Sequence, residues 1–385
     1  MPDEVPVVVI ATILNPTGPT GVQSHFSALR DYLRERGRNS MLVTPFDAPG
    51  ILVYPTFAAR RIIDLLSGPA SVWWYRYWHE FFLRVALRRV LAAHANVVVY
   101  AQCPLSARAA MRVRRYRTQG VTMVVHFNGS QADEWSDQGK IQRDGRLARH
   151  IRRTEAAVLP ALDGIVYVSR YMRRQLEERF PALNNVRSEV IPNFSRSGTA
   201  KPGRPTIDIV NVGTLEPRKN QQFLLAVLAE AKRAGHRFTL ALIGDGPDRQ
   251  HLERISRESG VAEQVRFCGN LPHAIDRMSC ARLYAHSARM ENLPLALIEA
   301  MACGLPILAP AVGGITDMFE NGNAGYFWDI DDVQMSAKLM INLLNDPEHL
   351  ESMSRAARSS FEQRFDTNRV AGQLYEFIVA RVEHA

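Results

Sequence analysis

Two glutamates flank the start of a predicted helix, in a pattern that could hold a sugar nucleotide. Glu291 precedes, and Glu299 lies within, a segment with proline near its start and Gly-Leu-Pro at its end, which predicts a helix over 294–303. Leucine stands before that proline instead of a capping residue, so the amides of Leu295 and Ala296 are free to hold an anion. Because carboxylates accept hydrogen bonds from hydroxyls, we expect ribose at one glutamate and hexose at the other.

A cationic pair occupies another loop of the same half. Arg218 and Lys219 lie in the loop 213–220, which comes directly after a predicted strand and before a predicted helix over 220–234. Arg grips a phosphate with a planar fork and Lys adds a point charge, so this loop is a candidate phosphate clamp. Taken alone, the pair could equally belong to a solvated loop; Glu291 and Glu299 in the same half favour the clamp.

The chain alternates short β-branched runs with helical stretches, which is typical of parallel sheets built from βαβ units. In the first half the predicted strands are 7–10, 41–44, 97–100, 123–127, 164–168 and 189–191. In the second half they are 207–212, 239–243, 265–267, 283–286, 307–309 and 325–327.

These runs predict an α/β chain of 385 residues with two doubly wound, Rossmann-like domains. The expected divisions are an N-terminal Rossmann-like domain (1–193), a Pro-, Gly- and Ser-rich linker (194–206), a C-terminal Rossmann-like domain (207–365) and a last helical segment (366–385) that would pack back on the N-terminal domain. Ligands of such sheets bind at the carboxyl ends of the strands, so we expect the domains to face each other across a cleft.

Five ordered motifs in the second half resemble those of the retaining glycosyltransferases of family 4, which have the GT-B fold. The family signature is a glutamate, seven residues and a second glutamate, followed by Ala-Met-Ala-Cys-Gly-Leu-Pro. The motifs lie at 213–220, 243–247, 265–269, 291–306 and 312–314. The resemblance covers essentially the whole chain, is strongest over 207–330, and implies a bacterial enzyme of the exopolysaccharide or lipopolysaccharide type.

The resemblance implies that the domain 1–193 binds the acceptor and that the domain 207–365 binds the nucleotide sugar. It also implies roles for single residues. The implied catalytic residues are His126, Glu291, Arg218 and Lys219. The implied donor-binding residues are Gly21, Thr214, Arg218, Lys219, Gly244, Arg266, Glu291, Asn292, Leu293, Leu295, Ala296 and Glu299. The family often has Arg where this chain has Thr214, so the phosphate charge is expected to fall on Arg218 and Lys219.

The first half matches the family at fewer positions. The loop 19–25 resembles the family's glycine loop, in which Gly21 would let the backbone approach the diphosphate and Gln23 replaces the usual acid. His25 also matches, and His126 occupies the position of the family's active-site histidine. Further polar candidates at strand ends are Asn128, Asp133, Glu134, Ser169 and Arg170.

The net charge of +8 is unevenly distributed, because residues 1–200 hold 27 of the 47 cations but only 16 of the 39 anions. Three of the five tryptophans, Trp73, Trp74 and Trp78, fall in a segment (73–89) that also carries Arg76, Arg84, Arg88 and Arg89. Tryptophan interleaved with Arg is typical of an interfacial membrane helix, with the cations on lipid phosphates. A buried aromatic helix is the alternative. Arg112, Arg114, Arg115 and Arg117 form a second basic cluster.

We therefore expect a metal-independent hexosyltransferase that moves a hexose, with retention, from a UDP- or GDP-linked donor. No cofactor is expected, and Asp329 and Asp331 are interpreted as a helix start. The expected acceptor is a glycan or a polyprenyl-diphosphate-linked sugar, with an anionic membrane surface as a further partner and no nucleic acid. An acidic N-terminus and four widely spaced cysteines favour the cytoplasm, at the inner face of the membrane. The rivals are transfer to a small-molecule acceptor, a nucleotide-sugar 2-epimerase, and a nucleotide-sugar- or DNA-binding module.

Overall fold

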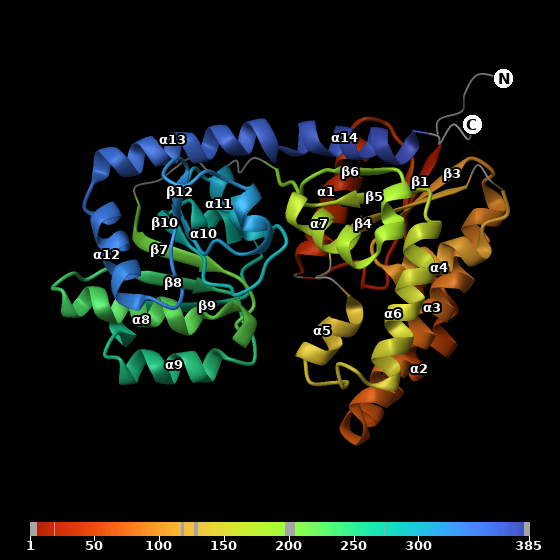
Figure 1. Cartoon of the computed structure of the whole chain (residues 1–385), viewed down its shortest axis with the longest axis horizontal. Helices are drawn as coiled ribbons and strands as arrows, with labels where there is room; N and C mark the ends of the chain where they lie inside the picture. Colours follow the sequence, from red (N-terminus) through yellow and green to blue (C-terminus); the bar gives the residue numbers. More distant parts are fainter. Residues whose placement is uncertain are drawn as a thin grey trace. The chain divides into compact units, whose positions relative to one another are not determined.

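The computed structural model describes residues 6–18, 20–116, 119–126, 130–196, 205–272 and 274–380. The chain divides into two compact units, one formed by the described residues of Met1–Pro192 and Ala371–Ala385, the other by Asn193–Val370. Each unit contains one six-stranded parallel sheet with helices around it (Figure 1). Two doubly wound domains are therefore confirmed.

The sheet of the first unit has the strand order β2-β1-β3-β4-β5-β6. Its strands are β1 (Val7–Ala11), β2 (Ser40–Val43), β3 (Val97–Ala101), β4 (Gly120–Val125), β5 (Gly164–Tyr167) and β6 (Ser188–Val190). The helices are α1 (Gly21–Glu35), α2 (Gly50–Leu66), α3 (Gly68–Ala93), α4 (Pro104–Val113), α5 (Gln131–Asp137), α6 (Arg146–Val158) and α7 (Arg170–Arg179). Strand order reverses between β1 and β3, where a crevice opens at the carboxyl edge of such a sheet.

The second sheet has the order β12-β11-β10-β7-β8-β9, which reverses between β7 and β10. Its strands are β7 (Ile207–Val212), β8 (Leu240–Ile243), β9 (Val265–Gly269), β10 (Ala281–Ala285), β11 (Ile307–Ala309) and β12 (Gly325–Phe327). The helices are α8 (Gln221–Arg233), α9 (Arg249–Glu258), α10 (Ala274–Met278), α11 (Leu295–Ala302), α12 (Val333–Leu344), α13 (Pro347–Arg364) and α14 (Thr367–Val379). In this unit α8 and α9 lie on one side of the sheet and α11 and α13 on the other (Figure 1).

Each of the twelve predicted strands overlaps an observed one, with ends that differ by at most three residues. The largest shift is at β4, which begins at Gly120 and not at Met123; the predicted end at Phe127 lies outside the described residues. The helix predicted over 294–303 begins at Leu295, because Pro294 has an extended backbone (φ −70°, ψ 124°) and precedes the first turn.

The end of the chain returns to the first unit. Helix α14 begins at Thr367, and its residues from Ala371 onward group with the N-terminal residues. The guanidinium of Arg187 lies 3.9 Å from the centre of the Phe377 ring, and it donates a hydrogen bond of 2.9 Å to the carbonyl of Phe377. Most of the predicted linker, 197–204, lies outside the described residues.

The three neighbouring tryptophans of the first half lie on helix α3 and differ in their exposure to solvent. Trp73 is exposed, whereas Trp74 and Trp78 are half-buried, and the Trp74 indole donates to the carbonyl of Thr56 at 2.9 Å. The expectation that Arg76 meets lipid phosphates is wrong, because its guanidinium is buried and donates to Gln131 Oε1 at 2.6 Å. No helix in the described part of the chain is long and apolar enough to cross a membrane.

Candidate functional site

Four charged or titratable side chains meet at the carboxyl edge of the second sheet, beside its switch point. Lys219 follows β7, and its Nζ donates to Oε1 of Glu291, which follows β10. Arg218 Nη1 lies 3.9 Å from Glu291 Oε2, and His286 Nε2 lies 3.4 Å from Oε1. This cluster unites three residues that the sequence singled out, Arg218, Lys219 and Glu291, with one that it did not.

Glu291 is buried but stays ionised. Burial by itself would raise the pKa of its carboxyl, yet the charge of Lys219 and the neighbouring imidazole of His286 hold that pKa at about 2. Burial also lowers the pKa of His286, so the imidazole is neutral when it faces the carboxylate. The site therefore presents a fixed negative oxygen with two cations beside it, before any ligand arrives.

Backbone contacts hold the loops of this cluster together. The amide of Arg289 donates to the carbonyl of Arg218 at 3.1 Å, and Ser287 Oγ donates to the carbonyl of Lys219 at 2.8 Å. Asn220, which follows the pair, has a left-handed backbone (φ 53°) that lets the 3-10 turn Pro217–Lys219 run directly into α8. The loops after β7 and β10 are thus a single framework.

Two glycines allow these loops to approach closely. Gly313 has φ 57°, and a Cβ there would overlap the carbonyl oxygen of Glu291, which accepts the amide of Gly314 at 3.0 Å. Gly244 has φ 135°, and a Cβ there would overlap the carbonyl oxygen of Gly213. Only glycine combines a positive φ with the absence of a Cβ. Gly244 therefore allows the loop that carries Arg218 and Lys219 to pack closely.

The predicted anion site lies at the start of α11. No side chain caps this helix, and its first residues Leu295 and Ala296 are only partly buried. The preceding loop is anchored by Asn193, whose Nδ2 donates to the carbonyl of Leu293 at 2.7 Å. Asn292 is buried beside Glu291. Uncapped amides at a helix start carry partial positive charge, which suits a phosphate.

Glu299 differs from Glu291 in its environment. Burial, without a cation beside it, raises the pKa of the Glu299 carboxyl to about 7. Both glutamates nevertheless act on one hydroxyl, because burial and then the charges of Glu291 and Glu299 raise the pKa of Tyr284. The charges of both carboxylates therefore reach Tyr284 of β10, while the pKa of Glu291 is lowered and that of Glu299 is raised.

Two predicted donor-binding residues form no hydrogen bond or ion pair with the cluster among the described residues. Arg266 is an exposed residue within the edge strand β9, two strands away from β7, and among the described residues no contact links it to Glu291. Thr214 is exposed, and its carbonyl accepts from Gln221 Nε2 at 3.0 Å. Their assignment to the donor site stays a prediction.

A second group of residues lies at the carboxyl edge of the first sheet. His126 directly follows β4, and its Nε2 lies 3.2 Å from the hydroxyl of Tyr100 on β3. The His25 ring meets the His126 ring edge-on, with centres 4.7 Å apart. Burial lowers the pKa of His126 to about 4, so its imidazole is neutral and suited to hydrogen bonding.

The glycine loop of the first unit builds a helix cap. Gly21 is the first residue of α1, Thr20 is its N-cap, and the Gln23 side chain accepts from the Thr20 amide at 3.1 Å. Gln23 Nε2 also donates to the carbonyl of Asn15 at 2.9 Å. Gln23 therefore stabilises the start of α1, and Pro19 lies outside the described residues.

Two of the other polar candidates of the first unit, Asp133 and Ser169, stabilise its structure. Asp133 forms ion pairs with Arg179 at 2.6 Å and with Arg152 at 2.9 Å. Burial alone would raise the pKa of Asp133, but the hydrogen bonds from these two arginines lower it. Ser169 caps α7 by accepting from the Met172 amide at 3.1 Å. Arg170 and Glu134 lie in the first turns of α7 and α5, and Asn128 lies outside the described residues.

Sequence reasoning missed His286, Tyr284 and Tyr100. All three lie at the carboxyl ends of strands β10 and β3, where parallel sheets bind ligands. A polar residue at the last positions of an apolar strand is the signal that could have identified them.

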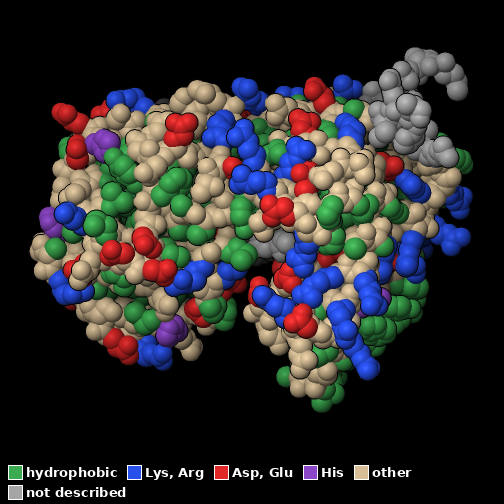
Figure 2. Space-filling view, viewed as in Figure 1, with side chains coloured by type: hydrophobic (Ala, Val, Ile, Leu, Met, Phe, Trp, Pro, Cys, Tyr) green, Lys and Arg blue, Asp and Glu red, His purple; other side chains and the backbone are tan. Residues whose placement is uncertain are grey.

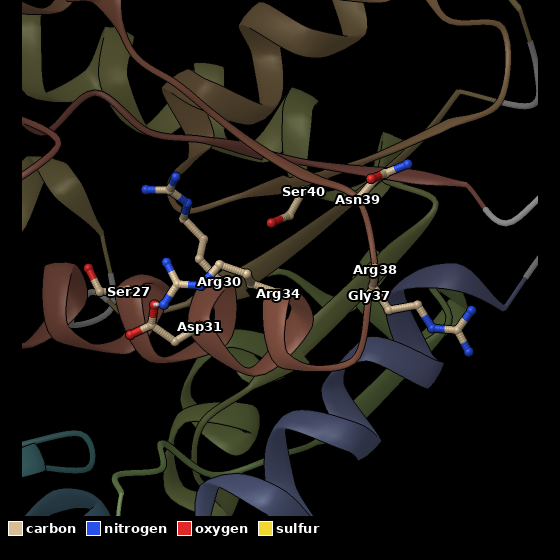
Figure 3. Close-up of a pocket in the computed structure, with 8 residues that line it drawn as sticks. All are labelled: Ser27, Arg30, Asp31, Arg34, Gly37, Arg38, Asn39 and Ser40. Carbon is tan, nitrogen blue, oxygen red and sulfur yellow. Dashed lines mark hydrogen bonds and ion pairs between the residues drawn. The ribbon is translucent and has the colours of Figure 1, made fainter.

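A cavity of about 530 Å³ lies elsewhere in the first unit, between the end of α1 and the start of β2 (Figure 3). Arg30, Arg34 and Arg38 line it, and Arg34 pairs with Asp31 at 2.6 Å. In Figure 3 the Arg38 side chain points away from the other labelled residues. Because Ser40 begins β2, the cavity lies at the amino edge of the sheet, away from His126.

Each half of the chain matches a known protein-family model. The family model described as "Glycosyltransferase Family 4" matches residues 19–194, and the model described as "Glycosyl transferases group 1" matches residues 195–360. A Bacillus anthracis protein named N-acetyl-alpha-D-glucosaminyl L-malate synthase is 31% identical over 36% of this chain and 36% of its own length. A Mycolicibacterium smegmatis GDP-mannose-dependent alpha-(1-6)-phosphatidylinositol monomannoside mannosyltransferase is 30% identical over 51% of this chain. The aligned part spans 56% of the latter, so the matches span from about a third to just over a half of these relatives.

Solved structures share the whole architecture at low identity. The sucrose-phosphate synthase of Thermosynechococcus elongatus superposes with a TM-score of 0.73 at 18% identity and covers 97% of this chain and 99% of its own. Anabaena HepE, solved with UDP and glucose, gives 0.70 at 15% identity, with 98% and 100% covered. The fold is thus the two-domain α/β GT-B fold. The chain belongs to glycosyltransferase family 4.

Proposed function

We propose that this protein transfers a hexose from a nucleoside diphosphate sugar to a glycan or lipid-linked acceptor, with retention at the anomeric carbon. The observation that carries the proposal is the cluster of Lys219, Arg218 and ionised Glu291 beside the uncapped start of α11. Family membership supports glycosyl transfer, and the cluster has the charges that a sugar diphosphate requires.

The cations stabilise the leaving group. As the bond between the sugar and the diphosphate breaks, negative charge grows on the phosphate oxygens. Arg218, Lys219 and the amides of Leu295 and Ala296 are fixed positive groups that meet this charge without a large rearrangement. The resemblance to family 4 implies that no metal is needed for this step.

The carboxylates bind hydroxyls. Glu291 is ionised and paired with Lys219, and it accepts hydrogen bonds from the hexose. Glu299 accepts hydrogen bonds from the ribose. His126, neutral near pH 7, donates a hydrogen bond to the hexose. In the front-face mechanism that the family implies, the acceptor hydroxyl attacks from the side of the leaving diphosphate, whose oxygen takes the acceptor proton.

The relatives support the donor class. One is named as GDP-mannose-dependent, and Anabaena HepE was solved with UDP and glucose. For the acceptor, a lipid-linked or polymeric glycan of the cell surface fits the phosphatidylinositol mannoside named for the Mycolicibacterium smegmatis relative. A small-molecule acceptor is the second candidate, since L-malate appears in the name of the Bacillus anthracis relative. We place the protein in the cytoplasm, at the inner face of the membrane.

A donor panel tests the proposal. The protein is incubated with UDP-glucose, UDP-N-acetylglucosamine, UDP-galactose and GDP-mannose, each with lipid-linked, oligosaccharide and small alcohol acceptors, with and without EDTA. We expect an α-linked product from an α-linked donor, insensitive to EDTA and lost in Glu291→Gln. An inverted product would overturn retention, and a product epimerised at C2 of the donor sugar would identify an epimerase.

A further inference from the structure

Helix α2 presents apolar side chains outward. Ile51, Leu65 and Leu66 are 84%, 87% and 81% exposed, and Tyr54 and Ile62 are exposed on the same helix. At 100° per residue, all but Leu52 of the exposed apolar residues of α2 fall on one continuous side. This side, together with Trp73 and Tyr77 of α3, is here termed the α2 face.

The opposite side of α2 already has a partner. Val53 is buried with Phe82 of α3, and Phe57 packs on the same cluster. Helix α2 therefore has two apolar sides: one packs on α3, and the other, the α2 face, is exposed. Surface helices of globular proteins usually carry polar residues outward, and an exposed apolar side of this extent indicates a binding surface.

Two aromatic residues of α3, the helix on which α2 packs, are also exposed. The rings of Trp73 and Tyr77 stack with centres 5.2 Å apart, and they are 51% and 48% exposed. Tryptophan and tyrosine favour the boundary between headgroups and hydrocarbon, where one end of the ring is apolar and the other is hydrated.

Cations border this face without carboxylate partners. Arg61 is exposed on α2 itself, and Arg146, Arg149 and Arg153 are exposed along one side of α6. In the described part of the chain none of these four forms an ion pair, whereas neighbouring Arg143 and Arg152 do. The four side chains thus leave their positive charge available.

Contacts within the first unit bring the segment before α6 next to the end of α2, and bring α6 itself next to α3. Lys140, shortly before α6, donates to Asp64 of α2 at 2.9 and 2.8 Å. Val72 of α3 shares a small core with Ala148 and Ile151 of α6. Figure 2 shows hydrophobic side chains gathered at the lower right of the view, next to a run of Lys and Arg side chains.

We propose that the α2 face docks on an anionic lipid bilayer, with Arg61, Arg146, Arg149 and Arg153 on lipid phosphates. An apolar helix side that lies in the headgroup boundary, bordered by unpaired cations, has the composition of an interfacial anchor. A second copy of the chain fits less well, because a two-fold contact would bring the same arginine rows of both copies together. The anchor differs from the one that segment 73–89 suggested, because Arg76 is buried and α2 supplies most of the apolar surface.

Vesicle binding tests the apolar part of the proposal. The full chain is sedimented with vesicles of phosphatidylglycerol and phosphatidylcholine, and with vesicles of phosphatidylcholine alone. We expect binding to the anionic vesicles only, weakened by about tenfold or more in Leu65→Glu/Leu66→Glu. The matched control is Met335→Glu, an exposed apolar residue of the second unit, which should bind as wild type. Equal losses in both variants, or no loss in the first, would overturn the assignment.

The basic part is tested with charge-neutralising variants. Arg146→Gln/Arg149→Gln/Arg153→Gln should weaken binding on the order of 100-fold, since each cation near an anionic surface contributes separately. The control removes three exposed cations elsewhere, Arg257, Lys338 and Arg369, and should retain binding. High salt should release the wild type, because the screening length shortens.

Two further outcomes would overturn the proposal. Equal binding to neutral and anionic vesicles would remove the role of the cations. A dimer in solution that becomes monomeric in Leu65→Glu/Leu66→Glu would assign the face to a second copy. Neither readout uses a sugar donor, so the docking surface and the proposed reaction fail independently. Circular dichroism verifies that each variant is folded.

Discussion

Lys219 and Glu291 form an ion pair across 72 positions of sequence, one after β7 and the other after β10. Both side chains are largely buried, with 18% and 10% exposed. The pair unites the cation that should bind a diphosphate with the carboxylate that should bind the sugar. The ion pair therefore fixes the positions of both charges before a donor binds.

Removing one partner of this pair should destabilise the protein. Lys219→Ala is expected to lower the free energy of unfolding by about 3 kcal/mol, because the buried Glu291 carboxylate loses its nearest cation. The double variant Lys219→Ala/Glu291→Gln should recover most of that loss. Urea unfolding of the wild type, both single variants and the double variant gives the coupling energy. Strictly additive losses would show that the two side chains are not coupled.

The two cations should act mainly on the transition state. We expect Arg218→Ala and Lys219→Ala each to lower kcat by about 100-fold while changing the donor KM only a few fold, because charge on the departing diphosphate grows during the reaction. Steady-state kinetics with the donor found in the panel measures this. Arg257→Ala, an exposed arginine of the same unit, is the control. Wild-type turnover in Arg218→Ala/Lys219→Ala would remove the clamp from the mechanism.

Glu299 should make donor binding depend on pH. Its carboxyl, with a pKa raised to about 7 by burial, is largely protonated in the free protein below that pH. If ribose hydroxyls donate to the carboxylate, nucleoside diphosphate should bind tighter as pH rises through about 7, by up to about tenfold between pH 6 and 8. Calorimetric titration of wild type and Glu299→Gln isolates this effect, and the variant should bind more weakly with a flatter profile. Parallel profiles would exclude Glu299 from the nucleotide site.

The raised pKa of Glu299 also makes the free energy of unfolding depend on pH. The buried carboxyl is most favourable when neutral, so its contribution is fully present below about pH 4.5 and is lost as pH rises through about 7. Compared with the wild type, Glu299→Gln should therefore gain stability as pH increases from about 5 to 8. Urea midpoints across this range provide the measurement, and a constant difference between the two proteins would contradict the raised pKa.

Gly313 should tolerate no side chain. A Cβ there would overlap the carbonyl oxygen of Glu291, so Gly313→Ala must displace the loop that carries this residue. We expect donor binding to weaken by at least about 100-fold, together with a loss of stability. Gly322→Ala is the matched control, because its φ of 88° imposes the same kind of backbone strain while its nearest side-chain atom is 3.8 Å away. Similar donor affinities in the two variants would show that the Glu291 loop adapts.

Tyr100 should position His126. Tyr100→Phe removes the hydroxyl 3.2 Å from Nε2 and leaves the packing of the ring in place. We expect a drop in kcat of about tenfold with an unchanged Kd for the nucleoside diphosphate, which binds the other unit. His126→Ala should cost more in kcat and likewise leave that Kd unchanged. A loss of nucleotide affinity in either variant would assign these residues a different role.

Local patterns in the sequence were enough to predict much of the fold. Each β-branched run became a strand because its side chains are apolar over a length that suits a buried parallel strand, and β7, β11 and β12 agree with prediction at both ends. The chemical candidates Arg218 and Glu291 could be placed at the carboxyl edge for the same reason, since each lies in the loop that follows such a run. The family motifs added roles that spacing by itself does not contain.

Only the tertiary structure decided which of these residues are partners. That Lys219 faces Glu291, and that His286 joins them, depends on β7 and β10 being neighbours in the sheet although β8 and β9 separate them in the chain. Likewise, Asp133 could not be assigned to a pair with Arg152 and Arg179 from local sequence. Charge alone does not specify such pairs, because the energy of an ion pair depends on distance and burial.

The sequence determined that segment 73–89 is aromatic and basic, but the fold decided which of its side chains reach solvent. Trp73 is exposed and Arg76 is buried against Gln131 because α3 has α2 on one side and α4 on another. The exposed side of α2 was not apparent from sequence either, since an apolar helix is ordinarily expected to be covered. Whether a side chain lies inside or outside depends on the neighbours of its helix, and these come from distant parts of the chain.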